Sequence, residues 1–340
     1  MTTTTANDEL LQLREALRGT LGTDGQDLQP TVAADWRSMW PALAELGLTA
    51  LCVPEPLGGF GLRADAAVMT AAELGAALYG GPYAGLTASA HALAQAAGDP
   101  VAGELLAGIL AGERVCAFGR LGPDGRLARL VDGVPGADAL LLLDQPGGGL
   151  MLFADPDGWT ADPAPHGFDV SRTCGDVTVS PGAGRPLPPA GQAVELYELL
   201  LAADAVGCVR RMLDRAVAYA GQRQAFGRPI GGFQAVQHRL ADHAVRAQGM
   251  TLVVRAAAGL FDADPAALRR AVATAALSVS SAAPLILHDL LQLTGAIGFT
   301  WEYGLHLYER RVHQDARLAA NPRAAQRSLA ELEGWTTHAH

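Results

Sequence analysis

The sequence has few cysteines, and their spacing fits neither a metal site nor a disulfide framework. The chain has 340 residues and four cysteines, and no two of these form a C-x-x-C pair. Scattered cysteines of this kind usually serve as small buried hydrophobic residues in proteins of a reducing compartment. The nine histidines also form no pattern of metal ligands, so we expect no metal site. The four cysteines are Cys52, Cys116, Cys174 and Cys208.

Positive charge is also scarce, and no segment is suited to cross a membrane. The formal net charge of −10 at pH 7 disfavours nucleic acid and anionic membranes as partners. The N-terminus has no basic region followed by an apolar core, and it continues directly into an amphipathic helical pattern. The longest uncharged run, residues 271–288, contains three serines and a proline and is short for a bilayer span. We therefore expect a cytoplasmic protein in which this run is a buried bundle helix.

Alanine and leucine dominate, and apolar residues recur at helical spacing over long windows, which indicates mostly α structure. Short β-like runs separated by Gly, Pro and Asp clusters interrupt this pattern. They lie at residues 115–118, 140–143, 150–154 and 176–179. The sequence thus predicts a mainly α fold with a small β domain. Its parts are an N-terminal helical domain (1–112), a β domain (113–183) and a C-terminal four-helix-type domain (190–336).

The most specific stretch is AYAGQRQAFGRPIGGFQAVQHRLAD, residues 218–242. An apolar helical run ends at Arg223, a bend containing Gly and Pro follows, and a second helical run begins near Gln234. Arg223 and Gln234 flank the bend. A guanidinium suits a phosphate, and a bidentate amide suits a flat polar ring. By itself this pattern is as typical of a purely structural helical hairpin with a Gly/Pro turn as it is of a binding site.

A second distinctive stretch, QLTGAIGFTWE, occupies residues 292–302. The two stretches together resemble the acyl-CoA dehydrogenase family. The first matches the family run R-x-x-F-G-x-x-I-x-x-x-Q-x-x-x-x-x-L-A-D at every position. The second is similar to Q-x-x-G-G-x-G-[FY], with Ala296 in place of the second glycine. The VPEPLGGFG loop at 53–61 and the DVSR segment at 169–172 also resemble family segments, and the resemblance implies a three-part order of helical, β and helical domains.

The resemblance implies FAD as the cofactor, lying across a subunit interface. Residues that match Arg223, Phe226, Gln234, Gln292 and Gly295 hold the adenine and diphosphate half of a flavin whose ring lies in the neighbouring subunit. Arg223 would neutralise the diphosphate, the two glutamines would bond polar edges, and Gly295 would admit close backbone approach. A surface ion pair is the alternative role for Arg223.

The middle section departs from the family pattern. Members that bind flavin and substrate in their own β domain carry a T-E-P-x-x-G-S-D loop and a W-I-[TS]-x-[GA] strand end, and this chain has neither. Its β domain is also shortened relative to that plan. In these respects the chain resembles the shortened subunits of bacterial heteromeric acyl-CoA dehydrogenases, notably from steroid side-chain degradation, in which only the complete subunit supplies a base.

Dehydrogenation of an acyl thioester needs a carboxylate base that faces the flavin ring. One family position for this base falls near residues 317–321, where the chain has no carboxylate, and the other falls by spacing on Tyr197. The catalytic candidates are Glu198, which is displaced by about 100° around the helix, and Asp204, two turns further on. A carboxylate in the apolar surroundings of Asp204 is costly unless it is paired or functional. Pairing of Asp204 with Arg210 or Arg211 is the alternative.

Three hypotheses for the function follow. The first is a dehydrogenase subunit that completes the FAD site of a partner in a heterotetramer and acts on a bulky acyl thioester. The second is a self-sufficient homodimer or homotetramer that uses Asp204 or Glu198 as base on a CoA-bound or carrier-bound thioester. The third is a non-redox scaffold or enzyme that reuses the fold without flavin. For the redox hypotheses, the resemblance also implies an electron-transfer flavoprotein as a partner.

Overall fold

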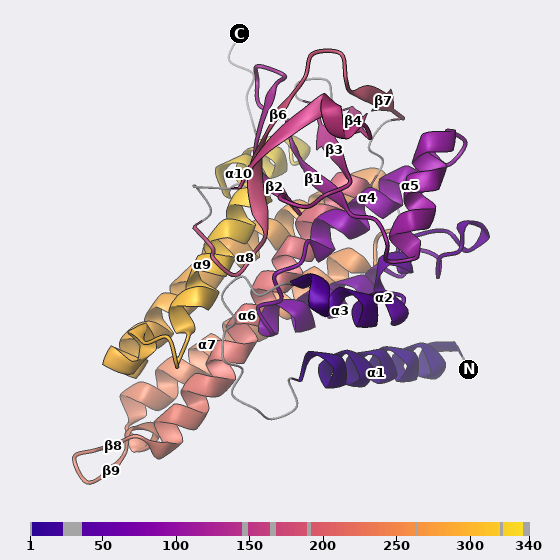
Figure 1. Ribbon diagram of the computed structural model, residues 1–340. Helices are drawn as coiled ribbons and strands as arrows, with labels where there is room; N and C mark the ends of the chain where they lie inside the picture. Colours follow the sequence, from indigo (N-terminus) through magenta and orange to yellow (C-terminus); the bar gives the residue numbers. More distant parts are fainter. Residues whose placement is uncertain are drawn as a thin grey trace.

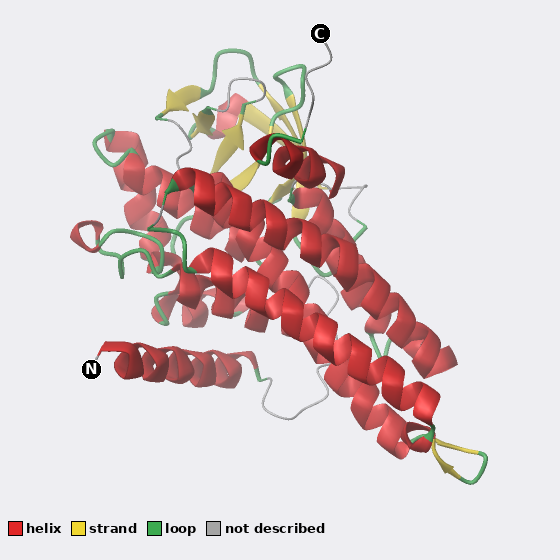
Figure 2. Cartoon of the chain, turned by 180° about the vertical axis from the view of Figure 1, so that it is seen from behind, coloured by secondary structure: helices red, strands yellow, loops and turns green. Residues whose placement is uncertain are grey.

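The computed structural model describes residues 2–22, 36–144, 149–163, 168–188, 192–262, 264–319 and 322–335. Helices come first, strands follow, and long helices complete the chain (Figure 1). Seen from behind, the strands of the larger sheet lie together above the helices, and a separate two-stranded hairpin projects at the lower right (Figure 2). The predicted mainly α fold with a small β domain is confirmed.

The N-terminal part consists of helices joined by short 3-10 turns. Asp99 caps one of these helices by accepting hydrogen bonds from the amides of Val101 and Ala102, and a proline follows at the first helical position, where no amide hydrogen is needed. The rings of Trp36 and Trp40 meet edge to face with centroids 6.0 Å apart. The helices are α1 (Thr2–Leu21), α2 (Trp40–Glu45), α3 (Ala64–Ala76), α4 (Tyr83–Gln95) and α5 (Pro100–Leu110).

The middle part is a seven-stranded sheet with the order β5-β6-β2-β1-β3-β4-β7. β1 and β3 pair in parallel, with Cys116 opposite Ala139, and the other neighbouring strands are antiparallel. β3 is buried along its whole length, as its unbroken apolar sequence predicts. The strands are β1 (Cys116–Arg120), β2 (Leu127–Asp132), β3 (Ala139–Leu143), β4 (Leu150–Phe153), β5 (Trp159–Pro163), β6 (Cys174–Val179) and β7 (Arg185–Leu187). β7 begins at Arg185, after residue 183, where the sequence predicts the end of the β domain.

The C-terminal part is a helical bundle organised around its first helix. α6 contacts α3 and α4 of the N-terminal part and α7, α8 and α9 of its own bundle. A two-stranded hairpin joins α6 to α7 and projects from the lower left end of the bundle (Figure 1). The elements are α6 (Ala193–Gln222), β8 (Gln224–Ala225), β9 (Arg228–Pro229), α7 (Gln234–Ala258), α8 (Pro265–Thr294), α9 (Leu305–Leu318) and α10 (Pro322–Leu332).

Two glycines let α3 and α6 approach very closely. A Cβ built on Gly207 would lie 1.8 Å from the carbonyl oxygen of Ala72, and one built on Gly75 would lie 2.2 Å from that of Asp204. These distances are far below van der Waals contact, so any side chain at either glycine would push the helices apart. This contact ties the N-terminal helices to the bundle and fixes the position of Asp204.

α8 is long and apolar enough to cross a membrane by length and composition. It nevertheless contacts α6, α7, α9 and α10, and Ile286, Leu287 and Leu290 are fully buried. Residues 271–288 therefore belong to a bundle helix, as predicted. The four cysteines are buried and free, which also agrees with the sequence.

Candidate functional site

The residues that the first motif singled out gather at the hairpin end of the bundle. Arg223 follows the last residue of α6 and its side chain is exposed. Its carbonyl oxygen accepts a hydrogen bond from the amide of Ile230 at 2.8 Å, which holds the two sides of the hairpin together. Gln234, also exposed, is the first residue of α7. The bend thus separates Arg223 and Gln234 in sequence but keeps them at one end of the molecule.

The tip of the hairpin is a tight turn with a bulky residue in an unfavourable conformation. Ala225 pairs with Arg228, and the two residues between them, Phe226 and Gly227, have φ of 51° and 78°. Positive φ at both central positions defines a type I′ turn, which favours Asn, Asp or Gly. An aromatic residue is strained there. The Phe226 side chain is 96% exposed and its ring meets that of Phe233 edge to face with centroids 6.2 Å apart, so little burial within this chain offsets that strain.

The second motif reaches the same end because α7 and α8 run antiparallel. Arg239 donates from Nε to Asp289 at 3.0 Å, and His243 Nε2 lies 2.6 Å from the same carboxylate. These contacts place the first turns of α7 beside the last turns of α8. Gln292 is exposed near the end of α8, and Gly295 ends it with a φ of 65° and open space around its Cα. The structure therefore brings all five predicted cofactor-binding residues to the hairpin end.

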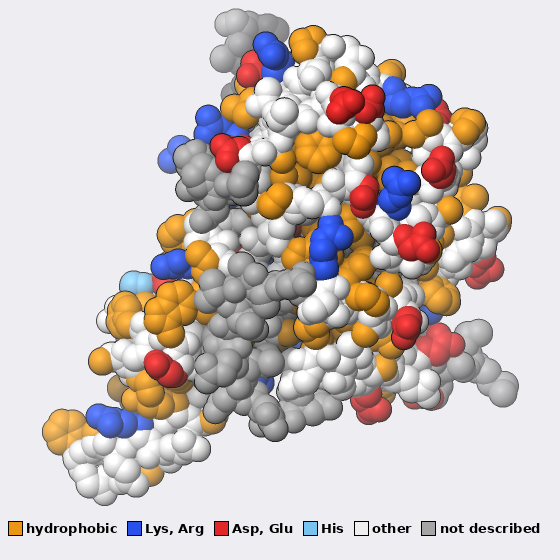
Figure 3. All heavy atoms as spheres, viewed as in Figure 1, with side chains coloured by type: hydrophobic (Ala, Val, Ile, Leu, Met, Phe, Trp, Pro, Cys, Tyr) orange, Lys and Arg blue, Asp and Glu red, His pale blue; other side chains and the backbone are white. Residues whose placement is uncertain are grey.

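The chemistry of this end fits the adenosine diphosphate half of FAD. Arg223 and Arg228 supply exposed cations, and Arg228 also stacks over the ring of Phe233 at 4.0 Å. Among the described residues no side chain caps the first turn of α7, and free amides at a helix N-terminus attract phosphate. Hydrophobic and basic surface occurs together at this end in Figure 3. Arg228 lies within the first motif but was not among the predicted cofactor-binding residues.

Several large apolar side chains around this end are exposed. Ile297 is 41%, Phe299 62% and Trp301 54% exposed. Together with the exposed Phe226, they add apolar surface near the end of α8 and at the hairpin, and exposed apolar side chains of this size are typical of a surface that another chain covers.

The β domain offers much less to a flavin ring. The turn between β1 and β2 does not carry the family's T-E-P-x-x-G-S-D sequence, and its amides are used internally. Gly122 donates to the carbonyl of Leu127 at 2.7 Å, Gly125 donates to Gly122, and Asp124 accepts from the amides of Arg126 and Leu127. Backbone donors that a flavin would need are therefore consumed by the turn itself.

Tyr197, at the family position of the base, fills space and offers no carboxylate. It is 1% exposed, and its ring packs on Phe118 of β1 with centroids 4.7 Å apart. Burial raises the pKa of its hydroxyl well above the usual value, so the phenol stays protonated. These residues do not fit the reactive half of the cofactor.

Glu198, the first catalytic candidate, is bound by an arginine from the sheet. Arg120 Nη2, at the end of β1, lies 2.6 Å from Glu198 Oε1. Glu198 and Asp315 line a cleft between α6, α8 and α9 that has a volume of only about 10 Å³. Nothing larger than a water molecule fits there. The sequence did not indicate Arg120, because the two residues are 78 positions apart.

Asp204, the second catalytic candidate, lies in a buried ionic cluster where the sheet, α6 and α9 meet. Arg172 Nη2 lies 2.6 Å from Asp315 Oδ1 and 3.2 Å from Asp204 Oδ1. Arg311 lies 2.6 Å from Asp169 and 3.5 Å from Asp204. None of the six charged residues is more than 7% exposed: Asp132, Asp169, Arg172, Asp204, Arg311 and Asp315.

The cluster has four carboxylates and two guanidinium groups, so its members differ in protonation. Burial would raise the pKa of Asp169, but Arg311 and the Ser171 hydroxyl outweigh it and hold this pKa below its usual range. Burial raises the pKa of Asp315 well above its usual range, and the nearby Asp204 carboxylate adds to this effect, although Arg172 opposes it. Burial also raises the pKa of Asp132. Asp315, whose pKa is raised well above its usual range, is the carboxyl whose protonated form the cluster favours most.

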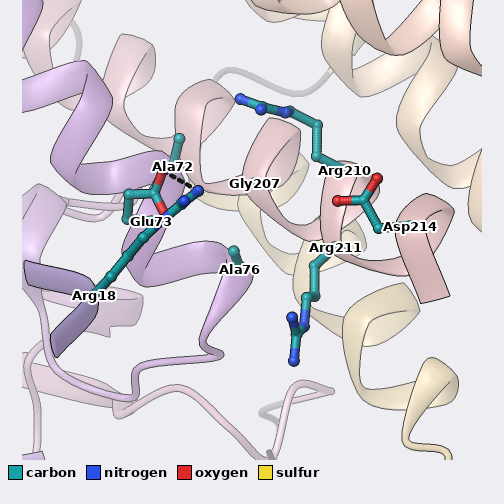
Figure 4. Close-up of a pocket in the computed structure, with 8 residues that line it drawn as sticks. All are labelled: Arg18, Ala72, Glu73, Ala76, Gly207, Arg210, Arg211 and Asp214. Carbon is teal, nitrogen blue, oxygen red and sulfur yellow. Dashed lines mark hydrogen bonds and ion pairs between the residues drawn. The ribbon is translucent and has the colours of Figure 1, made fainter. Parts of the chain in front are cut away.

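This arrangement favours the alternative role of Asp204 as a paired, buried aspartate. Two guanidinium groups hold its carboxylate away from solvent, so it is poorly placed to take a proton from a substrate. The predicted partners of this pairing were wrong, because Asp204 pairs with Arg172 and Arg311. Arg210 and Arg211 instead line a pocket that also includes Glu73 and Asp214 (Figure 4).

The remaining family position for a base, residues 317–321, is described only as far as residue 319. Arg317 is exposed, and Leu318 and Ala319 are buried. Residues 320 and 321 lie outside the described part of the chain. Across the described residues, no group of three or more His, Cys, Asp or Glu side chains is arranged to hold a metal ion.

Comparison with known proteins agrees with the fold. Residues 7–113 match the acyl-CoA dehydrogenase N-terminal domain, and residues 192–321 match the C-terminal domain. The chain is 34% identical to acyl-CoA dehydrogenase IpdE2 of Mycolicibacterium smegmatis over 294 residues, which cover 86% of each protein. It is also 34% identical to acyl-CoA dehydrogenase FadE34 of Mycobacterium tuberculosis over 91% of this chain, but it spans only 46% of that protein's length.

Solved structures show the same fold. The Tcur3481–Tcur3483 steroid acyl-CoA dehydrogenase (G363A variant) superimposes with a TM-score of 0.83 and 24% identity, covering 97% of this chain and 98% of that one. The ChsE4–ChsE5 complex of Mycobacterium tuberculosis gives 0.79 at 24% identity, covering 99% of each chain. Both structures contain two kinds of subunit, and the family uses FAD. With two domain matches and a relative that aligns over most of its length, the chain belongs to the acyl-CoA dehydrogenase family of oxidoreductases.

Proposed function

We propose that this chain is a subunit of a heteromeric acyl-CoA dehydrogenase that completes the FAD site of its partner and does not supply the catalytic base. One contrast supports this proposal above all. The hairpin end exposes residues suited to the adenosine diphosphate half of FAD, whereas at the family position of the base Tyr197 packs on Phe118 and the neighbouring Glu198 is paired with Arg120.

In this proposal each residue of the hairpin end has a separate role. Arg223 and Arg228 neutralise the diphosphate, and the first turn of α7 donates amides to it. Gln234 and Gln292 bond polar edges of the cofactor, and Gly295 lets the α8 terminus approach it. Phe226 inserts into the partner subunit, where burial of its ring offsets the strain of its backbone.

The reaction of the complex is α,β-dehydrogenation of an acyl thioester. Bound FAD would accept the hydride from the β-carbon, while a carboxylate of the partner subunit would take the α-proton. A polycyclic acyl group, such as a steroid side-chain thioester, is the substrate class that we propose. The structurally similar Tcur3481–Tcur3483 protein is a steroid acyl-CoA dehydrogenase, and this likeness supports the proposed class. The cleft at Glu198 is too small for such a group, which favours binding of the acyl group in the partner.

The proposal can be tested by measuring flavin content. The chain is purified alone and after co-expression with an acyl-CoA dehydrogenase chain that carries the T-E-P-x-x-G-S-D loop and is encoded beside it. We expect no flavin absorbance alone and one flavin per pair in the complex. Arg223→Ala and Gln234→Ala should each lower the retained flavin. Arg126→Ala, an exposed arginine on the β domain, is the matched control and should not.

Other results would support the other hypotheses. Flavin bound at about one per chain without a partner would mean a self-sufficient homo-oligomer and would contradict the proposal. A complex that forms but never contains flavin would mean a non-redox role. A complex that binds flavin equally well with Arg223→Ala and Gln234→Ala would show that the hairpin end is not part of the site.

A further inference from the structure

A second site lies far from the hairpin end, in a cleft between α1, α3, α6 and α7. The cleft has a volume of about 410 Å³, which is within the range of small-molecule pockets. Its residues on α7 lie close to Arg255, 21 positions after Gln234, or roughly 30 Å along the helix. The α6 residues that line it, Val206 among them, face away from the small cleft at Glu198. The site is therefore separate from the proposed FAD site.

The floor of the cleft is apolar and its rim is cationic. Val68, Met69, Val206 and Val254 are buried beneath it. Its rim carries one arginine from each of α1, α6 and α7 and one carboxylate, Asp65. The three arginines are Arg14, Arg210 and Arg255.

The neighbouring pocket of Figure 4 continues this cleft, since Ala72 and Arg210 line both. Together the two pockets contain five arginines and three carboxylates, although the whole chain has a net charge of −10. A local excess of cations in an acidic protein indicates a site for an anion.

Most of the acids here are already paired, but two cations are not. Glu73 binds both Arg14 at 3.0 Å and Arg18 at 2.8 Å, and Asp65 pairs with Arg63, which is outside the cleft. Arg210 and Arg255, by contrast, have no acidic partner among the residues that the structure describes. Burial lowers the pKa of Arg14, and although Glu73 opposes this, the neighbouring cations Arg18, Arg210 and Arg255 add to it. An anion in the cleft would relieve this repulsion.

We propose that this cleft binds an apolar carboxylate, with the hydrocarbon body on the floor between α3, α6 and α7 and the carboxylate between Arg210 and Arg255. The sequence contains no lysine, so the cations of the cleft are arginines. A planar guanidinium group can bind a carboxylate through two parallel hydrogen bonds, which the compact ammonium group of a lysine cannot do. The body would also contact Leu10 and Leu11 of α1, so binding would hold α1 against the bundle. This inference does not depend on the proposed dehydrogenase role.

The test is calorimetric titration of the full chain with sodium dodecanoate below its micelle-forming concentration. We expect saturable binding of one molecule per chain. Arg210→Gln and Arg255→Gln should each weaken it about tenfold, because each removes one charge-assisted contact. Both side chains are exposed, so these variants should fold. Arg246→Gln is the matched control, an exposed arginine on α7 outside the cleft, and should bind as the wild type does.

Two further measurements locate the ligand and test its charge. Dodecanoate should slow amide hydrogen exchange in residues 10–14 of α1 in the wild type, and it should not do so in the Arg210→Gln/Arg255→Gln double variant. Dodecan-1-ol, which has the same body without the charge, should bind at least about tenfold more weakly. Absence of saturable binding, equal affinity for the alcohol, or unchanged affinity in the double variant would each overturn the proposal.

Discussion

Glu198 Oε1 lies 2.6 Å from Arg120 Nη2, so the carboxylate nearest to the family's base position is bound to the end of β1. This ion pair joins the sheet to α6. Glu198 also lines the small cleft to which Asp315 contributes. A base must be free to approach the substrate, and Glu198 is held by an opposite charge. The pair therefore acts as a contact between domains.

Glu198→Gln should leave the turnover of the flavin-containing complex unchanged to within about twofold. Loss of a true general base lowers turnover by about 10²- to 10⁴-fold, so the steady-state rate distinguishes the two roles clearly. The variant should cost about 1 kcal/mol of stability, since the pair is only partly buried. A loss of turnover above about 100-fold at unchanged flavin content would show that Glu198 is the base.

Asp169→Asn should destabilise the chain by about 3 kcal/mol or more at pH 7, because it removes one partner of the buried Arg311. The pKa of Asp169 is lowered in the folded state. Its contribution is therefore present above the unfolded pKa near 4 and is lost as the pH falls through the folded pKa. Urea unfolding between pH 3 and 7 should show this loss in the wild type and not in the variant. Asp157→Asn, an exposed control, should change stability by less than about 0.5 kcal/mol.

Asp315→Asn should be tolerated far better than Asp169→Asn, although both carboxyls are buried in one cluster. The folded pKa of Asp315 is raised, so asparagine resembles its protonated form and can still accept from Arg172. A raised folded pKa contributes stability that is complete below the unfolded pKa, near 4, and is lost as the pH rises through the folded pKa. The stability of the variant relative to the wild type should thus increase from pH 4 to 8. A cost at pH 7 as large as that of Asp169→Asn would mean that Asp315 is ionised.

Phe226→Asn should affect the isolated chain and the complex in opposite directions. Asparagine suits the first central position of a type I′ turn, so the variant should raise the free energy of unfolding by about 0.5–1 kcal/mol. Loss of the exposed ring should weaken association with the partner subunit and lower flavin retention. Denaturant unfolding and size-exclusion chromatography measure the two effects. If association were unaffected, Phe226 would not be an interface residue.

Gly207→Ala should prevent the native packing of α3 on α6, because the new methyl group would lie 1.8 Å from the carbonyl oxygen of Ala72. Loss of soluble protein, or of several kcal/mol of stability, is expected. Gly249→Ala is the matched control within α7, where a Cβ meets no atom within 4 Å. It should stabilise the chain by about 1 kcal/mol through helix propensity. Equal stability of both variants would show that α3 and α6 are not packed this closely.

The strands show how much of the fold a local sequence pattern predicts. β1, β3, β4 and β6 coincide with the apolar runs predicted from the sequence. β2, β5 and β7 were not predicted. β5 and β7 form the two edges of the sheet and each contains a proline, which is tolerated at an edge. Such strands depend on pairing with a neighbour more than on their own propensity, and a linear pattern does not contain that information.

The sequence by itself determined the order of the domains and the chemistry of the hairpin end. Both depend on residues that are close together along the chain: the helical periodicity, the bend after Arg223, and the amide at Gln234. Local sequence specifies these because turn residues and helix termini are decided within a few positions.

Only the tertiary structure decided which charged groups are paired. Arg120 meets Glu198 across 78 positions, and Arg311 meets Asp169 across 142. No spacing rule links such residues, since they meet only after the sheet has packed on α6 and α9. The same packing that neutralises Asp204 and Glu198 leaves Arg210 and Arg255 without acidic partners among the described residues. In a folded chain, the partners that burial provides decide whether a charged group is structural or available to a ligand.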